Sequence, residues 1–389
     1  MTSQRSRTLD ILRTVAVLLV MGRHLFPPPA HLPAWVRETA ATLARGGWVG
    51  VDLFFVLSGF LVSGLLFEEH KRSGHLSVGR FLLRRGLKIY PPFYLLILVT
   101  AGLSLLGWWQ PFAGRQLGAE LVFVQNYSPG LWPHTWSLAV EEHFYLALPV
   151  LLLVLLRLSR TGGNAADPFS RIPVVFLGVA LACLTLRLVL AFSTPYQHTT
   201  HLFPTHLRID SLLLGVVLSY VRHYRGDWFF ATAKRFRPAM IVAGTLCFVP
   251  AFVFQLETTP LIPSLGVAFF AAGGGLLIWG LAGVEPQRSR LAAAAAFVGA
   301  RSYSIYLWHM AVTYWGLKLV LPAVPGLTWP AYAVGFVVGS VVVGLVMHAV
   351  VEAPMLRLRD RLIPSRGRRA PAVPLGGRRP TPITVPVAP

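Results

Sequence analysis

Long apolar runs recur along the whole chain and limit how it can fold more than any other feature. Most of them approach the roughly 20 residues that a helix needs to cross about 30 Å of hydrocarbon. We place ten runs, at residues 8–26, 48–67, 89–107, 138–156, 173–192, 209–222, 238–254, 264–283, 297–320 and 331–350. Because backbone polar groups in lipid must bond internally, each run is expected to be a helix. The sequence therefore predicts an all-α, polytopic membrane bundle of about ten transmembrane helices.

The distribution of charge sets the predicted orientation. The 389 residues are 54% hydrophobic and only 13% charged, yet the net charge is +20, which raises nucleic acid as an alternative partner. With ten spans and an inner N-terminus, however, 26 of the 35 Lys and Arg residues fall in inner segments. This asymmetry follows the positive-inside rule. We therefore predict a multi-pass protein of the cell membrane with both termini cytoplasmic, in contact with membrane lipids and not with nucleic acid.

The organisation is predicted to be one domain and a tail. Residues 1–356 form the membrane domain, and residues 357–389 are basic, proline-rich and poor in large apolar groups, which is typical of a disordered cytoplasmic tail. A cleaved signal peptide is an alternative for the first run, but Arg13 interrupts its apolar part and no small-residue cleavage motif follows. Cys183 and Cys247 lie within apolar runs, so no disulfide framework is predicted.

Charged residues within the first run are costly in lipid and are therefore candidates for function. Arg13 and His24 are eleven residues apart, almost three helical turns, so they share one face of the helix. That face would carry a permanent cation toward the inner leaflet and a titratable imidazole toward the outer one. In the alternative interpretation, Arg13 reaches the inner headgroups and His24 lies at the outer interface.

Carboxylates recur near the outer ends of two further runs. Asp52 should lie at a depth similar to that of His24, where it could orient the imidazole as in a general base. Glu141 and Glu142 begin the fourth run, and at most one of them should point into the bundle because adjacent helical side chains diverge. All three acids could instead serve as favourable first-turn residues of their helices.

A basic cluster lies in the inner segment before the third run. Arg80, Arg84 and Lys88 are spaced by four residues and share one helix face, with Arg85 alongside. Such a cluster could bind the phosphates of a cytosolic cofactor, or it could lie on anionic lipid.

Two more groups of polar residues lie in or near the membrane. Arg208 and Asp210 mark the outer mouth of the sixth run, and Ser302, Tyr306 and His309 share one face of the ninth. Three histidines also fall in one outer loop, but no carboxylate or cysteine lies at ligand spacing, so no metal site is predicted; these histidines are His198, His201 and His206.

Several motifs in order give the chain a family resemblance. They are an Arg followed after ten residues by His (Arg13 and His24), GVDLFFVLSGFL, RRGLKIYP, WSLAVEEHFYL, RIDSLLLG, SYSIYLWH and VEAP. Together they span residues 9–354. The chain resembles acyltransferase family 3, integral membrane enzymes that O-acylate glycans and some secondary metabolites. It departs from the usual pattern at Lys88, at His143 and at Arg23.

The resemblance implies roles for the residues singled out above. His24 would be the essential catalytic residue, with Arg13 supporting either His24 or the donor, and Arg84, Arg85 and Lys88 would form the family's inner basic motif. In the mechanism that we favour, this motif binds the phosphates of the donor, acyl-coenzyme A. We expect His24 to take the proton of an acceptor hydroxyl as general base, with Asp52 or Glu142 orienting the imidazole or the sugar. The groups expected to contact the acceptor, a cell-surface glycan or a glycosylated small molecule, are Glu141, Arg208, Asp210, Tyr306 and His309. A covalent acyl-enzyme relay is a variant of this mechanism.

A transporter or flippase without acyl-transfer chemistry is the alternative function. In that case, the intramembrane charges would line a substrate path. Consumption of acyl-coenzyme A by the purified protein distinguishes the two classes.

Overall fold

The structure is a computed structural model that describes residues 6–161, 167–286, 289–316 and 328–364. These residues form helices joined by loops, and no strand occurs among them. In chain order the helices are α1 Arg7–Arg23, α2 Ala34–Gly46, η1 Gly47–Val49, α3 Gly50–Ser73, α4 Val78–Leu105, α5 Gly114–Leu121, η2 Pro133–Thr135, α6 Trp136–Thr161, α7 Ile172–Ser193, α8 His198–His201, η3 Thr205–Leu207, α9 Ile209–Tyr224, α10 Gly226–Leu246, α11 Val249–Val253, the π-helical turn η4 Ile262–Gly266, α12 Val267–Gly280, α13 Arg290–Gly299, α14 Ser302–Ala311, the π-helical turn η5 Val312–Gly316, α16 Trp329–Met347, the π-helical turn η6 His348–Glu352, and α17 Ala353–Leu362.

The apolar helices confirm a multi-pass membrane protein. Among the described residues, seven helical segments are long and apolar enough to cross a bilayer: Ala34–Ser73, Val78–Leu105, Pro133–Thr161, Ile172–Ser193, Gly226–Val253, Ile262–Gly280 and Trp329–Leu362. The other three predicted spans fall on shorter elements. The first corresponds to α1, with 17 residues, and the sixth to α9, with 16. The ninth is divided among α13, α14 and η5, and its end lies outside the described residues. The count of ten stays a prediction.

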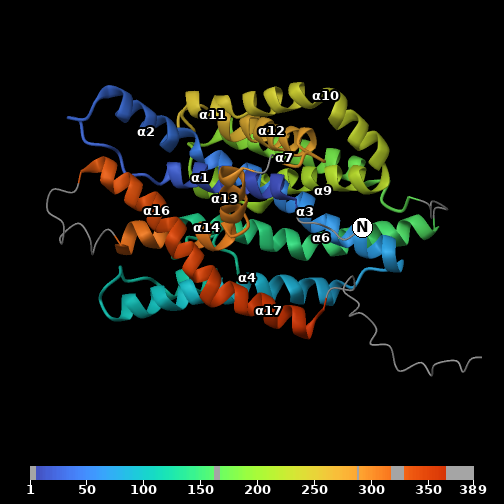
Figure 1. Ribbon diagram of the computed structural model, residues 1–389, viewed down its shortest axis with the longest axis horizontal. Helices are drawn as coiled ribbons and strands as arrows, with labels where there is room; N and C mark the ends of the chain where they lie inside the picture. The colour runs from blue at the N-terminus through green and yellow to red at the C-terminus, as the bar shows by residue number, and fades with distance from the viewer. Residues whose placement is uncertain (1–5, 162–166, 287–288, 317–327, 365–389) are drawn as a thin grey trace, which may run out of the picture.

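Helix α3 is the centre of the bundle. It packs against α1, α6, α9 and α12, with α10 and α12 on one side of it and α4 and α17 on the other (Figure 1). The contact with α9 is close because a glycine lies on each helix. A Cβ atom on Gly59 would collide with the carbonyl oxygen of Leu212, and one on Gly215 would collide with that of Val56. Small residues at facing positions let transmembrane helices approach at backbone distance.

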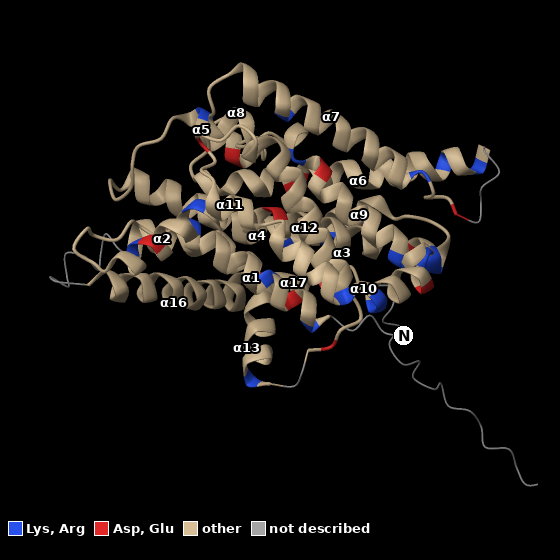
Figure 2. Ribbon diagram, turned by 90° about the horizontal axis from the view of Figure 1, so that it is seen from above, with Lys and Arg blue, Asp and Glu red and all other residues tan. Residues whose placement is uncertain are grey.

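One end of the bundle carries most of the basic side chains (Figure 2). The described chain also ends there, because Arg84 near the start of α4 pairs with Asp360 near the end of α17 at 3.0 Å. The N-terminus lies toward the same end of the bundle (Figure 1). That this end faces the cytoplasm stays a prediction. Helix α17 continues to Leu362, so the first residues of the predicted disordered tail 357–389 are helical. The part of this tail from residue 365 lies outside the described residues.

The loop that joins α4 to α6 is held by a buried carboxylate. Glu120 of α5 is fully buried and accepts hydrogen bonds from the backbone N–H groups of Leu131 and Trp132, at 2.9 and 3.1 Å. The Thr135 hydroxyl donates to the same carboxylate at 2.9 Å. These bonds fix the segment that leads into η2 and the start of α6, and η2 carries His134.

Candidate functional site

A cavity of about 1040 Å³ runs along α3 and is walled by α1, α4, α6, α14 and α17. The α3 residues that line it extend from Val51 to Ser73, which at about 1.5 Å per residue corresponds to roughly 33 Å. The cavity therefore extends over a length comparable to the thickness of a bilayer's hydrocarbon core. Its two ends differ in chemistry.

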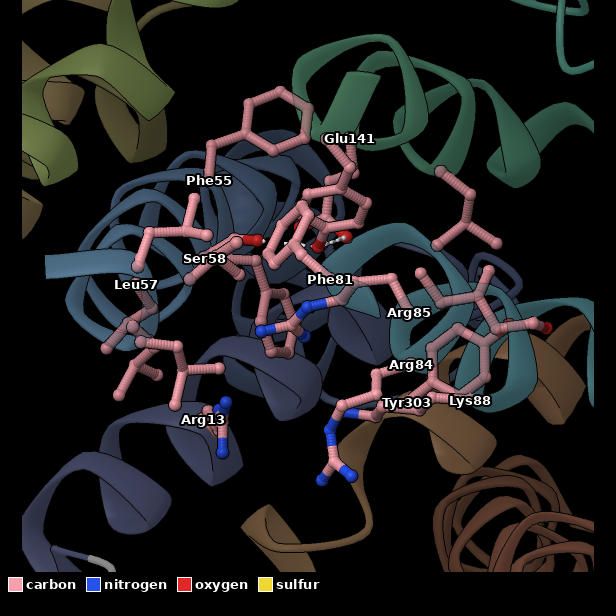
Figure 3. A pocket seen from close by; sticks show the side chains of 18 of the residues that line it. Arg13, Phe55, Leu57, Ser58, Phe81, Arg84, Arg85, Lys88, Glu141 and Tyr303 are labelled. Atoms are coloured by element: carbon pink, nitrogen blue, oxygen red, sulfur yellow. Dashed lines mark hydrogen bonds between the residues drawn. The ribbon is translucent and has the colours of Figure 1, made fainter. Parts of the chain in front are cut away.

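The basic end of the cavity contains the predicted donor-binding residues. Arg84, Arg85 and Lys88 all line it, and they project from one side of α4 (Figure 3). The Arg85 guanidinium lies over the Tyr145 ring, 5.5 Å from its centroid. The other basic side chains of the lining are Arg13, Arg72, Arg80 and Arg359. Such a concentration of guanidinium groups is suited to binding phosphates through charge-assisted hydrogen bonds.

Arg84 also contacts the segment that follows α17. It donates to the carbonyl oxygen of Ile363, and Arg80 donates to that of Pro364. The cavity mouth is thus bordered by the end of the described chain.

A chain of hydroxyl groups lies in the middle of the cavity. The Tyr145 hydroxyl donates to Glu141 Oε2 at 3.0 Å and lies 2.8 Å from Ser58 Oγ (Figure 3). The Tyr145 hydroxyl has one proton and donates it to the Glu141 carboxylate. Ser58 is therefore the donor in the bond between the two hydroxyl groups. Our sequence reasoning missed both hydroxyl residues. The signal for Tyr145 was its four-residue spacing from Glu141 on one helix face, whereas Ser58 lies on another helix and had no such signal.

The two adjacent glutamates of α6 have different surroundings. Glu141 lines the cavity, whereas Glu142, one of the two acids predicted to orient the catalytic imidazole or the sugar, is buried outside the cavity lining and accepts a hydrogen bond from the Tyr90 hydroxyl. Only one of the two carboxylates therefore points into the cavity, as the divergence of adjacent helical side chains predicts.

Tyr306 of α14 lies at the end of the cavity remote from the basic cluster. Its hydroxyl donates to the carbonyl oxygen of His134 at 2.8 Å and accepts from Ser137 Oγ at 2.6 Å. The Tyr306 ring lies 5.7 Å from the ring of His309, between centroids. Tyr306 therefore lines the cavity and packs against His309, which is not part of the lining.

His24 terminates α1 and bonds to His309. The Nδ1 atom of His24 lies 3.0 Å from the Val20 carbonyl oxygen and 3.1 Å from Nε2 of His309. His309 is fully buried, whereas His24 is partly exposed. In this arrangement His309, which we expected to contact the acceptor, contacts the predicted catalytic imidazole instead. Arg13 lines the cavity and pairs with Asp10 at 2.9 Å.

The expected contact between Asp52 and His24 is wrong. Asp52 instead pairs with Arg208 at 2.7 Å, and both side chains are fully buried. A second buried pair joins Asp210 to Arg187 at 2.7 Å, and sequence reasoning missed that arginine. A buried carboxylate requires a charged partner, and a guanidinium satisfies it better than a neutral imidazole. Arg208 and Asp210, predicted to bind the acceptor, thus form buried ion pairs away from the cavity lining.

His134 is a third histidine at this place that sequence reasoning missed. It is buried, and its ring lies 5.1 Å from that of His309, between centroids. Within the described residues, no group of three or more His, Cys, Asp or Glu side chains is placed to hold a metal ion.

Comparison with known proteins places the chain in a family. The family model described as an acyltransferase domain matches residues 7–349, nearly the whole described chain. The chain belongs to this acyltransferase family. The resemblance inferred from the motifs is thereby confirmed, and the chain is classed as an acyltransferase.

The acyltransferase chain is similar to curated proteins of two bacteria. It is 28% identical over 334 residues to the peptidoglycan O-acetyltransferase OatA of Listeria monocytogenes, across 78% of this chain and 48% of the relative. It is 26% identical over 328 residues to the O-acetyltransferase OatA of Staphylococcus aureus, across 77% of this chain and 49% of the relative. The chain thus spans about half the length of the curated relatives it matches. No solved structure matches the chain at a significant level.

Proposed function

We propose that this chain is a membrane O-acyltransferase that moves a short acyl group from acyl-coenzyme A to a sugar hydroxyl. The observation that carries the proposal is the cavity along α3. It begins among arginines and ends at Tyr306, one aromatic ring away from the His309–His24 pair.

The donor fits the polarity of the cavity. In our proposal the phosphates of coenzyme A bind Arg84, Arg85 and Lys88, and the thioester arm extends along the apolar α3 face formed by residues such as Phe54, Leu61 and Val62. Charged groups of the donor then stay at the basic end, and its reactive thioester approaches Tyr306. In this scheme the thioester must pass the Tyr306 side chain to reach His24.

The chemistry requires a base and a path for one proton. The acceptor hydroxyl loses its proton to the His24 imidazole while its oxygen attacks the thioester carbonyl carbon. The tetrahedral intermediate then collapses, the carbon–sulfur bond breaks, and His24 returns the proton to the departing thiolate. The products are an O-acyl ester and free coenzyme A, and His24 ends in its starting state.

The acceptor is proposed to be a cell-surface glycan or a glycosylated metabolite. The name of the Listeria relative specifies peptidoglycan as its acceptor, which supports a glycan acceptor for this chain. His24 lies at the C-terminal end of α1, remote from the basic end of the bundle, and is partly exposed. We therefore propose that the sugar approaches from the side of the cell membrane opposite to the donor.

A transporter is less well supported. The family model that matches the chain describes an acyltransferase domain, and the buried Asp52–Arg208 pair lies outside the cavity lining, where it cannot serve a substrate path. The test is to reconstitute the purified chain in lipid nanodiscs with labelled acetyl-coenzyme A and a panel of glycans. We expect alkali-labile label on a sugar hydroxyl. Intact donor and unmodified glycans across the panel would contradict the proposal.

A further inference from the structure

Three histidine rings near the end of the cavity are each bonded to a main-chain carbonyl oxygen. His24 Nδ1 lies 3.0 Å from Val20 O, His309 Nδ1 lies 2.6 Å from Tyr306 O, and His134 Nε2 lies 3.1 Å from Leu307 O. A carbonyl oxygen can only accept. The nitrogen that faces it must therefore carry the hydrogen, and this assigns the tautomer of each neutral ring.

The assignment determines the direction of the bond between two of these rings. His309 carries its hydrogen on Nδ1, so its Nε2 atom has a free lone pair. His24 carries its hydrogen on Nδ1, and this atom lies 3.1 Å from the Nε2 atom of His309. His24 is the donor in this bond, and its hydrogen is shared between Val20 O and His309. The Nε2 atom of His24 is then left unprotonated.

We infer that His309 is a positioning residue that holds His24 as the Nδ1–H tautomer and directs its basic Nε2 toward the acceptor hydroxyl. The inference rests on the proposed function for its catalytic meaning. It assigns to His309 the orienting role that a carboxylate commonly fills beside a catalytic histidine, and it removes His309 from the acceptor-binding set.

A neutral hydrogen-bond partner for His24 is consistent with the carboxylates of the bundle and their contacts. The carboxylates considered for this role have other partners, since Asp52 pairs with Arg208 and Glu142 accepts from Tyr90. A carboxylate beside His24 would be an additional buried charge within the bundle, and desolvation would make it costly. An imidazole lone pair accepts the same hydrogen bond without a net charge.

The role of His309 during turnover follows from the bond. When His24 Nε2 takes the hydroxyl proton, the ring becomes an imidazolium and its Nδ1–H becomes a stronger donor. His309 Nε2 stabilises that cation through the existing bond. His309 itself neither gains nor loses a proton in this step, and His24 returns its extra proton to the leaving thiolate sulfur.

Two substitutions separate positioning from packing. The side chain of Gln places an amide oxygen near the position of Nε2, where it can accept from His24. The side chain of Asn reaches only the position of Nδ1 and restores only the bond to Tyr306 O. We expect His309→Asn to lower kcat by about tenfold or more with little change in the KM for acyl-coenzyme A. We expect His309→Gln to retain most of the wild-type kcat.

A second measurement reads the tautomer directly in the wild-type protein. In ¹⁵N NMR spectra of histidine-labelled protein in nanodiscs, the signals of His24 are those lost in His24→Gln. We expect a protonated Nδ1 and an unprotonated Nε2 for this residue. An Nε2-protonated His24, or equal activity of the Asn and Gln variants at the wild-type level, would overturn the inference.

These outcomes are distinct from failure of the proposed function. If the wild-type protein transfers no acyl group to any glycan, the function is wrong, while the tautomer measurement still decides the hydrogen bond. If transfer depends on His24 and the Asn and Gln variants lose activity equally, His309 acts through packing and not as an acceptor. In that case the positioning role is wrong and the function stands.

Discussion

The Nδ1 atom of His24 lies 3.1 Å from Nε2 of His309, although 285 residues separate them in the chain. The bond joins the end of α1 to α14, and α14 also contributes Tyr306 to the cavity. The same helix therefore borders the proposed donor cavity and contacts the proposed base. This arrangement links the two halves of the reaction in space.

Loss of the basic cluster should weaken donor binding. We expect replacement of both Arg84 and Arg85 by Gln to raise the apparent KM for acyl-coenzyme A at least about tenfold, because charge-assisted phosphate contacts are worth about 1.5 to 3 kcal/mol each. The KM for the glycan should change much less. Initial rates at varied donor and acceptor concentrations measure both constants.

A matched control for this prediction lies on α10. Lys234→Gln with Arg235→Gln removes the same charge at exposed positions that do not line the cavity. If this control raises the donor KM as much as the cavity variant, net charge or membrane insertion explains the effect and specific phosphate binding does not.

The Asp52–Arg208 pair is expected to act on stability. Removing one partner leaves a buried charge uncompensated, which costs about 3 to 5 kcal/mol. Arg208→Met should therefore lower the thermal midpoint in detergent substantially, and Asp52→Leu combined with Arg208→Met should restore part of it. A double variant less stable than both single variants would refute the interpretation of Asp52 as a structural ion-pair residue.

The cavity predicts different effects for the two neighbouring glutamates. Glu141→Ala removes the acceptor of the Tyr145 hydroxyl inside the cavity and should lower kcat/KM for the donor about tenfold, because a buried hydroxyl left without its partner costs about 1 to 3 kcal/mol. Glu142→Ala should act mainly on thermal stability through Tyr90. Steady-state kinetics of both variants, normalised to folded protein, test this. The reverse pattern would place Glu142 and not Glu141 at the reaction.

Glu120 should make stability depend on pH. Burial raises the pKa of Glu120 to about 7, against an ordinary value of 4.5, even though donors from Trp132, Thr135 and Leu131 act in the opposite direction. Between these two pH values the folded state holds a proton that the unfolded state has lost. The contribution of Glu120 to the free energy of unfolding is therefore complete below about pH 4.5. It decreases as the pH rises toward 7, by at most about 1.4 kcal/mol per pH unit.

The measurement for Glu120 is a series of thermal midpoints in detergent between pH 4.5 and 8. Glu120→Gln keeps an oxygen acceptor but does not titrate, so its midpoints should fall less steeply with pH than those of the wild type. Parallel curves for the two proteins would assign the pH dependence to other groups.

Much of the fold could be predicted because hydrophobic length alone identifies helices in a membrane. Within the described residues, each predicted run falls mainly on helical elements of the structure. Breaks within the runs could not be predicted from apolarity. The ninth run is divided between α13 and α14 near Ala300 and Arg301, and α1 stops at Arg23. Hydropathy does not distinguish a continuous helix from two short ones packed end to end.

The candidate site was predicted less completely. Helical spacing identified the cluster of Arg84 and Lys88 because it depends on one helix only. The partner of His24 depends on how α1, α3, α9 and α14 pack, and spacing contains no such information. The acid nearest in predicted depth, Asp52, was therefore chosen, although it pairs with Arg208 and a histidine contacts His24.

The most direct test of the account is the rate of acyl transfer by the His24→Ala variant. The assay uses purified protein in nanodiscs, labelled acetyl-coenzyme A and the glycan that the wild type modifies. His31→Ala is the control, because His31 is exposed in the loop that follows α1. We predict that His24→Ala lowers kcat by about 10² to 10⁴ with unchanged folding, whereas His31→Ala retains wild-type activity. Transfer by folded His24→Ala at the wild-type rate would contradict the central claim.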